Sequence, residues 1–259
     1  MSQSSSIKDT IAKLSTGQRI GYAVLLPAWV FVSFMAVQLL LSGILIGLQY
    51  AGIDISGVLD NAIFSMSFSA IIYVLTLALV IGGPWLALKR KTTKEELGLQ
   101  RSVAWKDLLI APSGLITYFF ITAVLTTIAM HTLLFIDFNQ EQDVGFSGLT
   151  FQYEYVLAFL TLVVIAPVAE EVLFRGYLFG KLRAVIPTWV AVLIVSLLFG
   201  AVHMAWNVGI DTFALSIVLC LVTIVSKSLW PAIMIHMMKN FIAFYFLFIN
   251  PTLLTTIGG

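Results

Sequence analysis

Two adjacent glutamates and an arginine interrupt an otherwise apolar stretch in the second half of the sequence. They are Glu170, Glu171 and Arg175, within the run IAPVAEEVLFRGYLFG at residues 165–180. A charge at the centre of a membrane helix costs about 2.5–3.5 kcal/mol on insertion scales, so such residues are rare and mark functional sites. A carboxylate placed there can act as a general base that activates a water molecule. This stretch is therefore the first candidate for a catalytic site.

The spacing of these residues predicts different roles for the two glutamates. Glu171 and Arg175 are four residues apart, so on a helix they share a face and can form an ion pair. Glu170 is rotated by about 100° from Glu171 and does not share that face. We therefore expect Glu171 and Arg175 to support the site, and Glu170 to be the glutamate that is free for chemistry.

A second apolar stretch, FGAVH at residues 199–203, contains a histidine. Phe199 lies one turn before His203, and Gly200 has no side chain to keep another backbone away. An imidazole can transfer a proton or donate a hydrogen bond to the oxyanion of a tetrahedral intermediate. We expect His203 to be catalytic and Phe199 to support it.

A third stretch, HMMKN at residues 236–240, places His236 and Asn240 on one helical face. The alternative for each of these polar side chains is an interhelical hydrogen bond without catalysis. Because buried ionisable groups cluster at functional sites, we favour convergence into one site. The predicted catalytic residues are Glu170, His203, His236 and Asn240.

The composition identifies the elements that must position these residues. Of 259 residues, 60% are hydrophobic and 10% are charged, whereas a soluble domain has about 25% charged residues. The chain is therefore predicted to be an all-α polytopic membrane protein. Apolar runs of about 20 residues mark the spans. We expect seven, or eight if one long segment is a hairpin, near 21–49, 63–88, 107–136, 155–180, 187–206, 212–228 and 230–249, with a break at Pro112 in the third.

The domain organisation follows from the same runs. Residues 1–20 are a polar N-terminus, residues 21–250 form a single transmembrane domain, and residues 251–259 are a short tail. All Lys and Arg residues except Lys239 lie in alternate loops or at their borders, which predicts a cytoplasmic N-terminus. This pattern explains the basic residues and gives no support for nucleic-acid binding.

The remaining polar and sulfur-containing residues have simpler interpretations. The single Cys220 excludes an intrachain disulfide and is read as a packing residue. His131 has no neighbouring polar pattern and is read as structural. Lys239 is expected to extend its ammonium group towards the cytoplasmic surface.

The three motifs together resemble a known family. EEVLFR at 170–175, FGAVH at 199–203 and HMMKN at 236–240 match, in order, the EExxxR, FxxxH and HxxxN signatures of the CPBP family of intramembrane proteases. This family includes the CAAX prenyl endoproteases and bacteriocin-processing or immunity proteins. EELGLQRSVAW at 95–105 is also similar to a segment common in bacterial members. The resemblance covers a core at about residues 155–249.

The resemblance implies an intramembrane endopeptidase of the bacterial plasma membrane that acts on a membrane-associated peptide or protein within the lipid bilayer. By this resemblance Glu170 activates the water, His203 assists or binds the oxyanion, and His236 and Asn240 complete the site. The imidazoles and the carboxamide of Asn240 can donate hydrogen bonds that stabilise the oxyanion. No cofactor is favoured, because an HExxH motif is absent from the sequence. Zinc is the alternative, and its ligands would be Glu170, His203 and His236.

Three other functions are weighed against this one. GFSG at 145–148 resembles a rhomboid serine motif with Ser147 as the nucleophile, but it falls in an acidic loop and is read as a turn. A transporter typically has internal repeats, and the two halves of this sequence show no convincing repeat. A peptide-binding immunity protein without catalysis is the main alternative.

Overall fold

The computed structural model describes residues 14–59, 61–138, 140 and 149–253, in which all regular structure is helical. Ser147 lies outside these residues. The elements are α2 (Thr16–Tyr50), α3 (Ser56–Leu59), α4 (Ala62–Leu88), α5 (Trp105–Thr132), α6 (Gln152–Phe159), η1 (Leu160–Ile165), α7 (Ala166–Glu170), η2 (Glu171–Phe179), α8 (Gly180–Val185), α9 (Thr188–Ala201), α10 (Trp206–Ser226), α11 (Trp230–Phe244) and η3 (Tyr245–Ile249), where η denotes a π-helix.

Each of the seven predicted spans overlaps a helical segment of the described structure. Six helical segments are long and apolar enough to cross a membrane: Thr16–Tyr50, Ala62–Leu88, Trp105–Thr132, Gln152–Val185, Trp206–Ser226 and Trp230–Ile249. The seventh, α9, has only 14 residues and a length of about 21 Å, which is less than the hydrocarbon thickness of about 30 Å. The prediction of an all-α polytopic membrane protein is confirmed.

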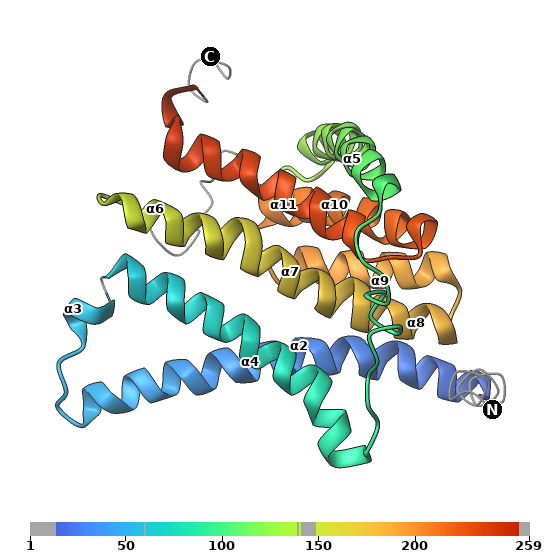
Figure 1. Cartoon of the computed structure of the whole chain (residues 1–259), viewed down its shortest axis with the longest axis horizontal. Helices are drawn as coiled ribbons and strands as arrows, with labels where there is room; N and C mark the ends of the chain where they lie inside the picture. The colour runs from blue at the N-terminus through green and yellow to red at the C-terminus, as the bar shows by residue number, and fades with distance from the viewer. Residues whose placement is uncertain (1–13, 60, 139, 141–148, 254–259) are drawn as a thin grey trace.

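Two groups of helices flank the long central helix Gln152–Val185 (Figure 1). On one side α2 packs against α4, α8 and α9, and α4 contacts α7 and η1. On the other side α10 packs against α5, α9 and α11, while α11 contacts η1 and α7. The central helix thus contacts both groups, and the two predicted glutamates lie in its middle.

The basic loop at residues 89–104 is fixed against the turn between α10 and α11. The backbone N–H of Leu229 donates to the carbonyl of Gly98 over 3.0 Å, and the indole N–H of Trp230 donates to the carbonyl of Arg101 over 2.7 Å. Gly98 has a φ of +72° and lies close to Leu229, so a side chain there is disfavoured. These contacts place two of the basic loops at one end of the bundle.

Two details of the predicted spans are wrong. α5 runs without interruption through Pro112, because a proline removes one backbone N–H and a membrane helix tolerates that loss where neighbouring groups compensate. α10 begins at Trp206 rather than near residue 212. Asp211 is therefore a residue of the helix and not of the preceding loop.

Candidate active site

The central helix changes its winding at the two glutamates. α7 ends at Glu170, and the π-helix η2 begins at Glu171. π-helical turns inside α-helices occur frequently at functional sites. Within η2 the predicted ion pair is present: Nη1 of Arg175 lies 2.9 Å from Oε1 of Glu171, and both side chains are fully buried.

His236 of α11 connects this ion pair to Glu170. Its Nδ1 lies 2.8 Å from Oε1 of Glu171, and its Nε2 lies 3.7 Å from Oε2 of Glu170. Since a carboxylate accepts hydrogen bonds, the proton of the neutral imidazole is on Nδ1. His236 therefore faces both glutamates, and its Nε2 faces Glu170.

Phe199 of α9 is the common neighbour of the charged and imidazole groups. The guanidinium carbon of Arg175 lies 4.2 Å from the centre of the Phe199 ring, a distance typical of a cation–π contact. The ring also meets those of His203 and His236 edge-on, with centroids 5.1 and 5.8 Å apart. Phe199 is fully buried and holds α9, η2 and α11 at fixed distances around the site.

His203 lies just beyond the end of α9, in the turn that leads to α10. Its Nδ1 is 2.7 Å from the backbone carbonyl of Phe199. A carbonyl only accepts, so Nδ1 carries the proton and Nε2 is directed elsewhere. Because α9 is too short to cross the bilayer, we expect this turn to lie within the thickness of the membrane. Non-helical backbone is tolerated there only where it is buried in protein or lines a cavity.

Gly200 brings α9 and α10 into close contact beside His203, as the sequence predicted. A Cβ at Gly200 would lie 2.7 Å from the carbonyl oxygen of Gly209. That oxygen belongs to the backbone of α10, so relief of the contact requires the two helices to move apart. The position of His203 depends on this approach because the turn begins two residues after Gly200.

Gly200→Ala is expected to lower the free energy of unfolding by about 1–3 kcal/mol, the usual cost of overpacking. Thermal unfolding in detergent measures this change. Gly43→Ala is the matched control, since a Cβ at that helical position meets nothing within 4 Å. Equal stability of the two variants would contradict the proposed role of the close contact.

Glu170 is held differently from Glu171. Its side chain is 14% exposed, whereas that of Glu171 is fully buried. The hydroxyl of Tyr73 on α4 donates to Oε1 of Glu170 over 2.7 Å, and Oε2 faces His236. Tyr73 was not predicted as a site residue, because its only signal in the sequence is a hydroxyl group among the aliphatic residues of the second span.

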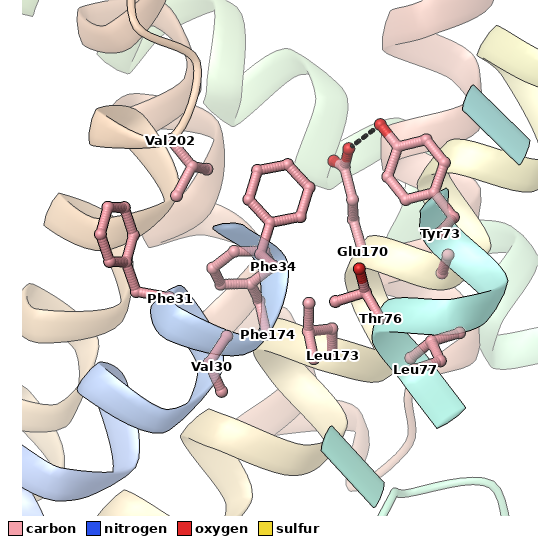
Figure 2. Close-up of a pocket in the computed structure, with 11 residues that line it drawn as sticks. Val30, Phe31, Phe34, Tyr73, Thr76, Leu77, Glu170, Leu173, Phe174 and Val202 are labelled. Atoms are coloured by element: carbon pink, nitrogen blue, oxygen red, sulfur yellow. Dashed lines mark hydrogen bonds between the residues drawn. The ribbon is translucent and has the colours of Figure 1, made fainter. Parts of the chain in front are cut away.

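A small apolar cavity lies beside the carboxylate of Glu170 (Figure 2). Its volume is about 30 Å³, enough for about one water molecule. Residues of α2, α4, α7 and η2 line it, together with Val202 next to His203. Tyr73 and Thr76 supply the polar groups of the α4 wall. Glu170 thus has direct access to a space in which a reacting molecule fits.

Asn240 has a different environment from the other predicted residues. Its amide nitrogen donates to the backbone carbonyl of Leu162 over 2.9 Å. Leu162 precedes Glu170 by eight residues, about 12 Å of helical rise. The contact links α11 to η1 and fixes the helix that carries His236.

The remaining polar residues lie apart from the glutamates. Nζ of Lys239 is 3.3 Å from Oδ2 of Asp211 on α10, so the expectation that it extends to the surface is wrong. The hydroxyls of Tyr118 and Thr122 on α5 donate to Oδ1 of the same aspartate over 2.5 and 2.9 Å. The ammonium group of Lys239 therefore pairs with a carboxylate inside the bundle and does not extend into water.

His131 is an exposed residue in the last turn of α5.

The alternative zinc ligands Glu170, His203 and His236 do not form one donor group in the described part of the chain. In residues 14–59, 61–138, 140 and 149–253, no group of three or more His, Cys, Asp and Glu side chains could hold one. Glu170 and His236 face each other. The orientation of the His203 ring is set by the hydrogen bond from its Nδ1 to the carbonyl of Phe199.

One family model matches the segment of the chain that contains this site. Residues 152–242 match the family model described as Type II CAAX prenyl endopeptidase Rce1-like. The match extends from α6 into α11 and contains every predicted catalytic residue. No match was found among curated proteins or among solved structures. Residues 152–242 thus match an Rce1-like CAAX prenyl endopeptidase domain, which is consistent with the resemblance to the CPBP family of intramembrane proteases.

Proposed function

We propose that this protein is an intramembrane endopeptidase that uses Glu170 as the general base on a water molecule. The Rce1-like domain supports an intramembrane endopeptidase in general. The observation that carries the proposal is the contrast between the two glutamates. Glu171 is buried in an ion pair, whereas Glu170 is partly exposed, borders a cavity and faces an imidazole.

The reaction is a hydrolysis in two steps. Glu170 accepts a proton from water as the water oxygen attacks the carbonyl carbon of the scissile peptide bond, which gives a tetrahedral oxyanion. Collapse of this intermediate breaks the C–N bond, and protonated Glu170 returns the proton to the leaving amine. The products are a carboxylic acid and an amine, and Glu170 is regenerated.

The histidines and Asn240 assist in separate ways. We assign oxyanion stabilisation to His203, whose Nε2 is not used by the bond to Phe199 and donates in the imidazolium form. Glu171 orients His236 towards Glu170. Asn240 holds α11 against η1, and through this contact it sets the position of His236.

We propose a mechanism without a metal ion. The support is the donor geometry: the described Glu and His side chains of the site do not form a three-ligand group. A zinc-dependent reaction is the competing mechanism, and chelation followed by addition of zinc distinguishes the two.

The location follows the distribution of charge. We propose that the chain is a multi-pass protein of the bacterial plasma membrane with its N-terminus in the cytoplasm. Basic residues dominate the loop at 89–104, which packs against the turn between α10 and α11. Positive charge is enriched on the cytoplasmic side of membrane proteins.

The proposed substrate is a membrane-associated peptide or protein. The family model supports a prenylated CAAX peptide, and an unprenylated signal, pheromone or bacteriocin precursor is the alternative. A peptide-binding immunity role without catalysis is the competing function, because it needs the same polar pocket but no proton transfer.

Peptide profiling by mass spectrometry tests the proposal. Proteoliposomes with the wild type, Glu170→Gln or the exposed control Glu95→Gln are incubated with farnesylated CAAX peptides and with unprenylated membrane peptides. We expect cleavage by the wild type and the control, none by Glu170→Gln, and no effect of chelator. Loss on chelation with recovery on zinc addition would establish the metal mechanism. Identical profiles for all three proteins would favour the binding function.

A further inference from the structure

Tyr73 connects the N-terminal helices to the predicted catalytic glutamate. It lies on α4, outside the segment 152–242 that matches the family model. Its hydroxyl donates to Oε1 of Glu170 over 2.7 Å, as Figure 2 shows. A hydrogen bond to an ionised carboxylate is stronger than one between neutral groups and restricts the rotation of the side chain.

This bond assigns the two oxygens of Glu170 to different neighbours. Oε1 is occupied by Tyr73, while Oε2 faces Nε2 of His236. A general base must keep one oxygen within hydrogen-bond reach of the proton that it removes. Tyr73 therefore limits Glu170 to one orientation, in which Oε2 serves the reaction.

Thr76 provides a second polar group on the same wall of the cavity. It is 2% exposed, lines the cavity with Glu170, and its hydroxyl has no hydrogen-bond partner among the described residues. Threonines elsewhere in the bundle donate to the carbonyl four residues earlier, namely Thr117, Thr127, Thr212 and Thr223. A buried hydroxyl without such a bond costs about 1–3 kcal/mol, so Thr76 points to a ligand in the cavity.

The cavity, of about 30 Å³, has room for at least one water molecule. Glu170, Tyr73 and Thr76 are the polar residues of its described lining, and the remaining side chains are apolar. Two polar groups too far apart for a direct hydrogen bond are commonly bridged by one water.

We infer that α4 forms part of the active site: Tyr73 is a positioning residue for Glu170, and Thr76 binds the reacting water in the adjacent cavity. This inference rests on the proposed function of Glu170. It extends the catalytic unit beyond the Rce1-like domain, because the domain alone contains neither α4 residue. The competing explanation is that both residues only join α4 to the central helix.

Kinetics in proteoliposomes separate these explanations, with the peptide that the wild type cleaves in the profiling experiment as the probe. Tyr73→Phe is expected to lower kcat about 10–100-fold with KM within about twofold, since misplacement of a catalytic group costs up to about 100-fold. Thr76→Val is expected to lower kcat about tenfold, and Thr76→Ser to restore it, because serine retains the hydroxyl.

Matched controls come from α5, where a tyrosine and a threonine donate to a carboxylate inside the bundle. Tyr118→Phe and Thr122→Val remove the same atoms from Asp211, so they reproduce the loss of an interhelical bond away from Glu170. We expect kcat within about twofold of the wild type for both. If Tyr73→Phe, Thr76→Val, Tyr118→Phe and Thr122→Val all lower kcat equally, the hydroxyls of α4 have a purely structural role. That result overturns the inference.

A spectroscopic measurement keeps the test independent of turnover. The infrared carboxylate band of Glu170, assigned by difference against Glu170→Gln, is expected to shift in Tyr73→Phe and to stay unchanged in Tyr118→Phe. An unchanged band in Tyr73→Phe overturns the positioning role. If the wild type cleaves no peptide, or if Glu170→Gln retains full activity, the proposed function fails, whereas the band still decides whether Tyr73 holds Glu170.

Discussion

Glu170→Gln is expected to lower kcat/KM about 10²–10⁴-fold, the usual contribution of a general acid–base group. Glutamine has nearly the same shape, and its carbonyl oxygen can still accept the hydrogen bond from Tyr73. It cannot accept the proton of the attacking water. The loss should therefore appear in kcat, with little change in KM or in thermal stability, when the variant is assayed in proteoliposomes.

Two results would contradict this expectation. A KM increase with unchanged kcat would mean that Glu170 only binds the substrate. Activity within about threefold of the wild type, with Glu95→Gln as the exposed control, would remove Glu170 from the chemistry and leave the non-catalytic role. Glutamate and glutamine differ here only in proton affinity and charge, so this substitution tests the base more directly than alanine does.

The fold was largely predictable from the sequence, because a membrane span must be apolar along its whole length. The predicted span 63–88 differs from α4 (Ala62–Leu88) by one residue, and the span 230–249 coincides with the segment Trp230–Ile249. The start of α10 was not predictable in the same way. Asp211 looks like a loop residue until its partners on α5 and α11 are known.

The local geometry of the site was also predictable where it depends on spacing along one helix. The pair Glu171–Arg175 and the proximity of Phe199 to His203 follow from four-residue intervals. Contacts between helices carry no such signal. Tyr73 and Glu170 are 97 residues apart, and only the packing of α4 against α7 brings them together.

The short α9 explains how His203 reaches the site. A span that continued to residue 206, as the hydropathy predicted, would carry His203 towards the far surface of the membrane. Instead α9 ends at Ala201, and Val202 of the turn after it lines the same cavity as Glu170. Hydropathy does not detect this end, because a turn buried in protein is as apolar as the helix.

Arg175→Met is expected to lower the free energy of unfolding by about 3–5 kcal/mol, the cost of leaving one charge of a buried pair uncompensated. Both side chains of the pair are fully buried, and Oε2 of Glu171 has no hydrogen-bond partner in the described part of the chain. Reversible unfolding in mixed detergent measures the change. Activity should fall as well, because Glu171 also orients His236.

A double variant separates the charge of Arg175 from its packing. Arg175→Met/Glu171→Gln removes both charges at nearly constant volume, and replacing a whole buried pair is often close to neutral. It should therefore be more stable than Arg175→Met alone. If both variants lose the same stability, the contact of Arg175 with the ring of Phe199 is the larger contribution.

The double variant should still have low activity, since a neutral glutamine at 171 holds the imidazole of His236 less strongly than a carboxylate does. Stability restored without activity would show that the ion pair serves two purposes: it neutralises a buried arginine, and it fixes the histidine that faces Glu170.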